Sequence, residues 1–165
     1  YSIYKFGTLR SSEYIIKRFL KYPFFNYKIL ISDNKNTSIL IYRVENIKGM
    51  DKKIIRILDL ITTKDKNGKI NSAKLINFIK KLLLNTNILF ADFFCTNKEI
   101  NNIFKKNGFI KINNKKVDIP IKFNPIVKKD RNQNLEIFYD QKNRFNFSKS
   151  YITKSDGDQD RVNQN

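Results

Sequence analysis

The chain has 165 residues, with 33 Lys and Arg against 15 Asp and Glu, and a formal net charge of +18. This length fits one domain, and 41% apolar residues are enough for a core, so the composition argues against a disordered chain. One Cys and no His argue against a disulfide framework and a zinc site, and they exclude chemistry with a histidine base. No apolar run reaches the roughly 18 residues that a membrane span needs.

The basic residues are mostly lysines scattered along the chain, and only seven of the 33 are Arg. Because Arg is the residue that reads bases and phosphates with paired hydrogen bonds, this composition argues against a nucleic-acid-binding protein. Lys, Ile and Asn are abundant together, which is typical of AT-rich codons. We therefore interpret the charge mainly as a solvated surface, although its positive field favours anionic small ligands such as nucleotide-linked substrates or coenzyme A.

The first half of the chain is predicted to contain one helix and then three strands, at residues 11–21, 27–32, 38–45 and 54–62. Ser11 or Ser12 can cap the helix. The polar residues 33–37 between the first two strands predict a hairpin turn. The third strand is apolar on both faces apart from Arg56 and Asp59.

The second half is predicted to hold a loop at 63–70, helices at about 72–84 and 97–107, and strands at 88–95, 109–112, 117–123 and 134–139. The strand at 88–95 is interrupted only by Asp92. Gly108 lies where a glycine commonly ends a helix. The residues beyond about 153 are polar, which is typical of a disordered tail.

Two strands that are apolar on both faces are each followed by a helix, and this pattern indicates parallel pairing inside a mixed sheet. The early hairpin makes the first half of that sheet antiparallel. We therefore predict an α/β fold in a single domain over residues 1–152, followed by a polar acidic tail over 153–165.

The segment from Asn97 to Phe109 resembles a pattern of the GNAT acyltransferase superfamily. In that pattern an Asn opens a helix, an aromatic residue follows seven positions later, as Phe104 does here, and Gly-Phe closes the helix, as Gly108 and Phe109 do. The order of the elements is also similar. The resemblance implies a mixed, mostly antiparallel sheet in which one parallel pair splays apart, with helices on both faces.

More narrowly, the chain resembles GNAT-like proteins that accompany bacterial surface-polysaccharide and nucleotide-sugar biosynthesis. Segments 18–27, 120–125 and 155–163 carry this likeness, and the last, SDGDQDRVN, is the most distinctive. The resemblance implies a cytoplasmic enzyme that transfers an acyl group from acetyl-CoA or another acyl-CoA to an amino group of a nucleotide-linked sugar.

Asp59 and Asp92 are the candidate catalytic residues. Burying a carboxylate inside an apolar strand is unfavourable in free energy unless it is paired. Each of the two must therefore have a partner or a functional role. In the GNAT arrangement both would lie beside the acceptor cleft, where one could act as general base with a raised pKa. The alternative is structural: each accepts backbone N–H groups or pairs with Arg43 or Arg56.

By the same resemblance, Gly68, Lys69 and Asn97 are candidates to bind the acyl-CoA. At Gly68 the backbone N–H could still approach a pyrophosphate, and Lys69 would add positive charge there. Asn97 would contact the pantetheine arm. Two departures oppose this reading, because the phosphate loop has one glycine instead of two, and Phe104 cannot donate a proton where many of these enzymes have a Tyr. Asn97 is equally well explained as a helix N-cap.

Five residues are candidates to bind an anionic substrate: Arg18, Tyr27, Arg43, Asp158 and Arg161. Arginines bind phosphates and carboxylates, and the tyrosine could line a sugar pocket. The alternatives are surface ion pairs and aromatic core. We expect the acidic tail to fold back onto the basic body, with Arg161 near the cleft.

No metal site is predicted. The alternating Asp156, Asp158 and Asp160 suggest a calcium loop, but the further ligands of an EF-hand are absent. Cys95, with no His to activate it, is predicted to be a small core residue.

Three functions are left open by the sequence. The first is the acyltransferase, with backbone amides at the splayed strands holding the thioester. The second is a non-catalytic binding domain of the same fold that is attached to, or assists, a polysaccharide-biosynthesis enzyme. The third is a basic nucleic-acid-binding module, which rests on charge alone.

Overall fold

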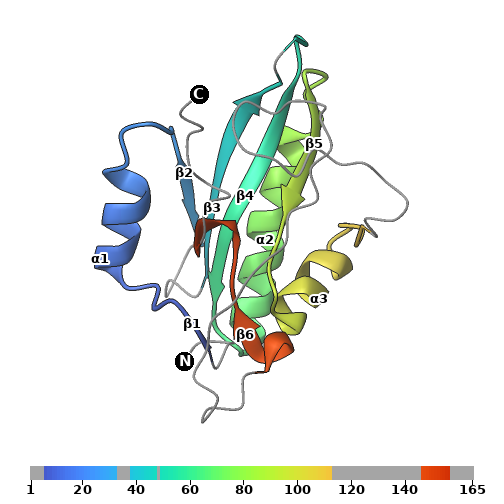
Figure 1. Ribbon diagram of the computed structural model, residues 1–165. Coiled ribbons are helices and arrows are strands. Elements are labelled where there is room, and N and C mark those ends of the chain that lie inside the picture. The colour runs from blue at the N-terminus through green and yellow to red at the C-terminus, as the bar shows by residue number, and fades with distance from the viewer. Residues whose placement is uncertain (1–5, 33–37, 48, 113–145, 157–165) are drawn as a thin grey trace.

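A computed structural model of the chain describes residues 6–32, 38–47, 49–112 and 146–156 (Figure 1). The main sheet has four strands in the order β2-β3-β4-β5, and a smaller sheet pairs β1 with β6. The strands are β1 (Phe6–Gly7), β2 (Lys28–Ile31), β3 (Ser38–Asn46), β4 (Lys53–Thr62), β5 (Ile88–Phe93) and β6 (Ser150–Tyr151). The helices are α1 (Ser12–Ile15), the π-helical turn η1 (Ile16–Leu20), α2 (Lys66–Leu82), α3 (Lys98–Lys106) and the short 3₁₀ turns η2 (Phe147–Lys149) and η3 (Lys154–Asp156).

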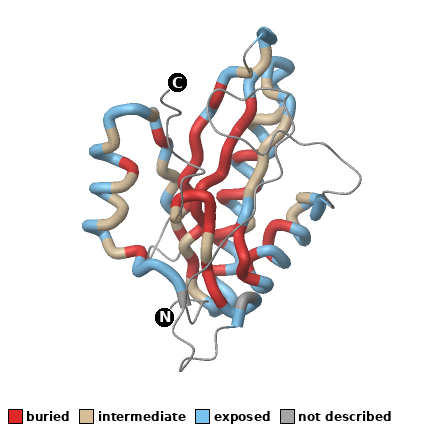
Figure 2. Tube along the Cα trace, in the orientation of Figure 1, coloured by how far each residue is buried: buried red, intermediate tan, exposed pale blue. Residues whose placement is uncertain are grey.

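The predicted fold class is confirmed. Strands β2, β3 and β4 pair in antiparallel fashion, and β4 pairs with β5 in parallel. Helices α2 and α3 pack on one face of the sheet around Leu40, Ile57 and Leu60. On the other face, Phe19 of η1 packs against Ile41 and Leu58. The buried residues run along the central strands between these layers (Figure 2).

A bulge in β4 shapes the centre of the sheet. Ile41 of β3 pairs with Asp59, whereas the next residue pairs with Ile57, so Leu58 is an extra residue on β4. A bulge of this kind re-aims the side chains beside it. Pairing between β4 and β5 also ends at Ile57 and Phe93, so the parallel pair separates beyond this point as expected.

Most of the local predictions are confirmed within the described residues. The first helix spans Ser12 to Leu20, and the Ser11 side chain accepts a hydrogen bond from the Tyr14 N–H. Asn97 caps α3, and Gly108 has a φ of 93°, as a glycine that ends a helix requires. The predicted hairpin turn at 33–37 and the strands at 117–123 and 134–139 lie outside the described residues.

Two predictions are wrong. The loop at 63–70 is shorter than expected, because α2 begins at Lys66, where the Asp65 side chain caps the helix through the Gly68 N–H. Apolar periodicity does not detect this polar first turn. Residues 109–112 are not a strand, and the Phe109 ring packs edge-on against Phe104, with ring centroids 5.0 Å apart.

In the part of the chain that the structure describes, no helix is long and apolar enough to cross a membrane. The same residues contain no group of three Asp, Glu or Cys side chains that could hold a metal ion.

We predict that Gly68→Ala destabilises the fold, although replacing a helical glycine with alanine ordinarily stabilises a protein by up to about 1 kcal/mol. A Cβ at this position would lie 2.3 Å from the Thr63 carbonyl oxygen, which belongs to rigid backbone. We expect the free energy of unfolding, measured with urea, to fall by about 1–3 kcal/mol. Asn67→Ala, at the exposed neighbouring position, is the control, and equal stability of the two variants would contradict the packing argument.

Candidate functional site

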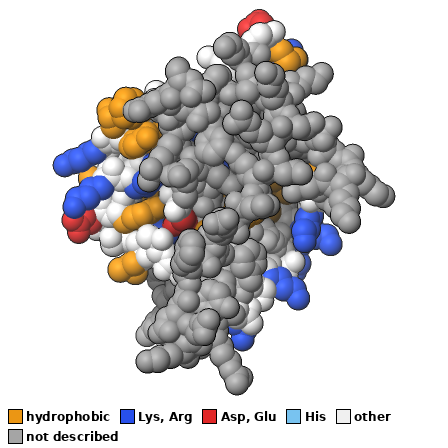
Figure 3. All heavy atoms as spheres, in the orientation of Figure 1, with side chains coloured by type: hydrophobic (Ala, Val, Ile, Leu, Met, Phe, Trp, Pro, Cys, Tyr) orange, Lys and Arg blue, Asp and Glu red, His pale blue; other side chains and the backbone are white. Residues whose placement is uncertain are grey.

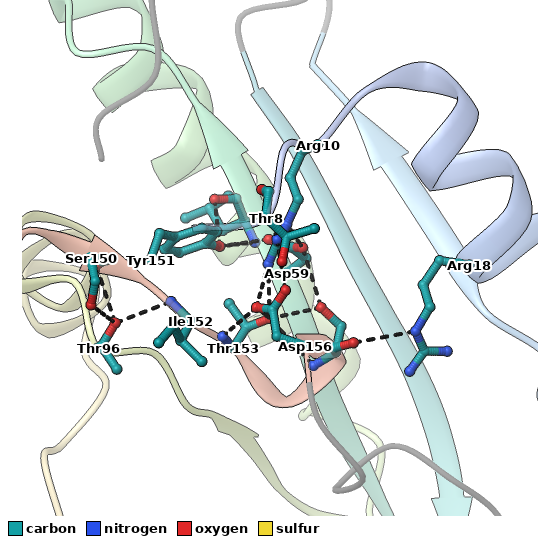
Figure 4. A network of polar contacts seen from close by, with 12 residues as sticks. Thr8, Arg10, Arg18, Asp59, Thr96, Ser150, Tyr151, Ile152, Thr153 and Asp156 are labelled. Carbon is teal, nitrogen blue, oxygen red and sulfur yellow. Dashed lines mark hydrogen bonds and ion pairs between the residues drawn. The ribbon is translucent and has the colours of Figure 1, made fainter. Parts of the chain in front are cut away.

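The opening between β4 and β5 is filled by the chain's own residues Ser150–Asp156, which we name the closing segment. On the β5 side, Cys95 pairs with Thr153, and the Thr96 N–H donates to the Ile152 carbonyl at 3.1 Å. On the β4 side, the Tyr151 side chain reaches Asp59 and Leu60 (Figure 4). The closing segment therefore occupies the space that the splayed pair would offer to a ligand.

Tyr151 makes the central contacts of this segment. Its hydroxyl donates to Asp59 Oδ1 at 2.6 Å and accepts the Leu60 N–H at 2.9 Å. The residue has 0% exposure, and burial raises the pKa of its phenol well above the ordinary value, so the hydroxyl keeps its proton. The Leu60 amide belongs to the strand 54–62, whose backbone amides were expected to hold a thioester, and here it donates to a side chain.

Asp59 is fully buried and is held by Arg10. The Arg10 Nε lies 2.7 Å from Asp59 Oδ2. Burial raises the pKa of Asp59, and the Arg10 guanidinium opposes that rise. With an ion pair on one oxygen and the Tyr151 hydroxyl on the other, this carboxylate is fully engaged.

Arg10 connects three parts of the chain. Its two terminal nitrogens donate to Asp156 at 2.8 and 2.6 Å, so one guanidinium joins the carboxylates of β4 and of the closing segment. The guanidinium also lies 5.2 Å from the centroids of the Tyr14 and Tyr151 rings. Nearby carboxylates outweigh burial, so the pKa of Arg10 is raised and it stays charged.

Asp92, the second predicted catalytic carboxylate, is engaged by other cations. Lys154 of the closing segment donates to Asp92 Oδ2, and Arg56 Nε lies 3.6 Å from Oδ1. Burial lowers the pKa of Lys154, whereas the carboxylate of Asp92 raises it. Asp59 lies beyond the point where β4 and β5 separate, whereas Asp92 still pairs with Arg56 across the two strands, and each carboxylate has its own cations.

The predicted cofactor residues have local structural partners. The Gly68 N–H donates to Asp65 Oδ1 at 2.6 Å, and its carbonyl accepts from Ser38 and Thr62. The Asp65 carboxylate thus caps the N-terminus of α2, where a pyrophosphate would otherwise bind. Lys69 is exposed. Asn97 is buried, and its side chain accepts the N–H groups of Glu99 and Ile100.

Three predicted substrate residues come together on the α1 side of the sheet. Arg18 donates to the Tyr27 hydroxyl at 3.4 Å, and the Arg43 guanidinium lies 5.8 Å from the centroid of the Tyr27 ring. Arg43 also stacks on Phe25 at 3.7 Å and pairs with Glu45. Asp158 and Arg161 lie outside the described residues.

These side chains belong to a larger group, which we name the aromatic–arginine cluster: Arg18, Phe19, Tyr22, Phe24, Phe25, Tyr27 and Arg43. The Tyr22 and Phe25 rings stack with centroids 5.8 Å apart, and Tyr22 meets Phe24 edge-on. Phe24 is 66% exposed. Arg18 lies 5.3 Å from the Tyr22 ring and also donates to the Ser155 carbonyl, so the cluster adjoins the closing segment.

Sequence reasoning missed Arg10 and Tyr151. Neither lies in a motif or a periodic pattern, and their partner Asp59 is 49 and 92 residues away. The signal that pointed to them was indirect: a carboxylate in an apolar strand requires a cation and donors from elsewhere in the chain.

The sequence matches no protein-family model and no curated protein. Among solved structures, the chain is similar to one described as "Crystal structure of a probable acetyltransferase", with 10% sequence identity and a TM-score of 0.42. This likeness covers 69% of the present chain and 68% of the other. At such an identity and TM-score, it carries no argument about activity.

We predict that Tyr151→Phe lowers the free energy of unfolding by about 1–3 kcal/mol, because the buried Leu60 N–H and Asp59 Oδ1 both lose a partner. Urea unfolding provides the measurement. Tyr22→Phe is the matched control, because its ring is only half-buried. If both variants had the stability of the original chain, the Tyr151 hydroxyl would not be holding the closing segment.

We also predict that Cys95 reacts slowly with Ellman's reagent at pH 8 and faster when the closing segment is loosened. Burial raises the pKa of this thiol to about 12, and Thr153 of the closing segment forms a backbone β-bridge with Cys95. Asp156→Ala removes two hydrogen bonds from Arg10 and should raise the labelling rate at least about tenfold. Glu13→Ala, which breaks an exposed ion pair with Lys17, is the control. An unchanged rate in Asp156→Ala would show that the segment does not protect Cys95.

Proposed function

We propose that this chain is a non-catalytic cytoplasmic domain that binds an anionic small molecule with an aromatic base, such as a nucleotide-linked sugar. In this role it assists an enzyme of polysaccharide biosynthesis, an association that rests only on the resemblance of the segments described above. The single observation that carries the proposal is the filled opening between β4 and β5. An acyltransferase of this arrangement needs that opening for its thioester.

Four contacts argue against acyl transfer. The Tyr151 hydroxyl takes the Leu60 N–H, which is therefore not available to polarise a carbonyl. Arg10 and Lys154 neutralise the two carboxylates that would act as base. The Asp65 carboxylate occupies the N-terminus of α2 and would repel a pyrophosphate there.

The aromatic–arginine cluster supports the class of ligand. Exposed or half-buried rings offer faces on which a base can stack, and stacking of this kind contributes about 1–3 kcal/mol per base. Phe24 is the exposed ring of the cluster, and Tyr22 and Phe25 are half-buried. Arg18, which is only half-buried, adds a guanidinium that suits a phosphate group.

Acyl transfer from acyl-CoA to a sugar amine is the second candidate. The observation that favours it is the separation of β4 from β5 beyond Ile57 and Phe93, with Asp59 past that point on β4 and Asp92 one residue before it on β5. This function requires the closing segment to move out. Departure of Tyr151 would free the Leu60 amide, and departure of Lys154 would leave Arg56 as the cation beside Asp92, which would accept a proton from the amine.

We predict that calorimetric titration detects binding of UDP-N-acetylglucosamine and gives no heat with acetyl-CoA at millimolar concentration. Arg18→Gln should weaken nucleotide-sugar binding about tenfold, because a charge-assisted contact with phosphate is lost. Lys17→Gln, one position away and exposed, is the control for net charge. Inorganic phosphate and uridine are titrated separately to distinguish the two halves of the ligand.

Three outcomes would contradict this proposal. Binding of acetyl-CoA to the original chain would establish the opening as a cofactor site. Binding of acetyl-CoA only to Asp156→Ala would support the second candidate, because that change loosens the closing segment. Binding of duplex or single-stranded DNA that persists at physiological salt, with no binding of the nucleotide sugar, would favour the nucleic-acid reading.

A further inference from the structure

Helix α2 has an unusual distribution of charge. Its 17 residues include five lysines and no acidic residue. Surface helices commonly pair charges of opposite sign four residues apart, and this helix cannot do so within itself. Like charges along one helix are therefore uncompensated unless a group from outside the helix meets them.

The outer face of α2 also exposes large apolar side chains. Ile70 is 45% exposed, Phe78 is 43% exposed, and Leu84, just beyond the end of the helix, is 82% exposed. The opposite face of the helix, which includes Leu75, Ile76 and Ile79, packs into the core. The exposed positions are therefore not needed to hold the helix on the sheet.

The lysines and the apolar side chains share one stripe. Lys74 lies between Ile70 and Phe78, and Lys81 lies between Phe78 and Leu84, at the spacing of three or four residues that places side chains on one helix face. A shallow, largely open hollow lies along this stripe, lined by Lys74, Asn77, Phe78, Lys80, Lys81 and Leu84. Lysine and arginine side chains also stand out along the sides of the molecule in Figure 3.

We propose that the outer face of α2 docks an acidic amphipathic segment of a partner protein. An apolar side chain of that segment enters the hollow beside Phe78 and Leu84, and its flanking carboxylates meet Lys74, Lys80 and Lys81. The inference rests on charge complementarity and on exposed apolar area, and it does not depend on what the aromatic–arginine cluster binds.

The alternation along the stripe favours a peptide over an anionic membrane surface. A helix that lies in a membrane has a continuous apolar face and carries its lysines on the opposite face. On α2 each exposed apolar side chain is instead separated from the next by a lysine on the same face. A segment about 25 Å long, which is the length of this helix, can make these alternating contacts.

Selection from a random library of 16-residue peptides tests this inference. We expect peptides enriched on the original chain to carry Leu, Ile or Phe at helical spacing, with Asp or Glu beside them. A selected peptide should bind Phe78→Ser and Lys81→Glu at least about tenfold more weakly, and 0.5 M salt should weaken it further. Leu20→Ser and Lys98→Glu are the matched controls, because both alter exposed residues on other elements.

Several outcomes would overturn the inference. One is that the selected peptides are neutral or basic. Another is that the original chain enriches no more peptides than Phe78→Ser does. A third is that the two control variants lose as much peptide affinity as Phe78→Ser and Lys81→Glu. Vesicles containing 30% phosphatidylglycerol form a separate arm, and vesicle binding that Phe78→Ser abolishes, with no peptide enriched, would make the face a membrane contact. Circular dichroism of each variant checks that the fold is retained.

Discussion

The carboxylate of Asp59, fully buried next to the β4 bulge, is the constraint on which the rest of the structure depends. A charge in that position is tolerated only when cations and donors satisfy it. Arg10 lies in the stretch between β1 and α1, and Tyr151 lies in β6. Both side chains contact Asp59. Because both partners are needed, the stretch around Arg10 and the closing segment both reach the middle of the sheet at Asp59.

The same physical reasoning explains why the interior offers little to a ligand. Lys154 pairs with Asp92, and the Asp65 carboxylate caps the N-terminus of α2. The chain's own groups therefore occupy the positions where a cofactor would need unpaired charges and free amides. Among the described residues, accessible groups outside the opening include the rings and guanidinium around Phe24 and Arg18, and the stripe of lysines and apolar side chains on α2.

Part of the fold could be predicted because its signals are local. Caps at Ser11 and Asn97, the glycine at 108 and the apolar strands were all readable within a few residues. The start of α2 was not, because its first turn is polar and its cap, Asp65, is an ordinary loop residue by composition. The strand expected at 109–112 does not form, because Phe109 packs instead against Phe104 of the preceding helix.

The same distinction between local and long-range signals applies to the candidate site. The sequence by itself determined that Asp59 and Asp92 are unusual, since a carboxylate in an apolar strand needs a reason whatever the fold, and the mixed sheet followed from strand and helix order. Only the tertiary structure decided that the reason is pairing. Arg10 meets Asp156 across 146 residues, and Tyr151 meets Asp59 across 92. Contacts over such separations depend on how the bulge, the splayed strands, the stretch around Arg10 and the closing segment come together, and no local pattern of residues records that geometry.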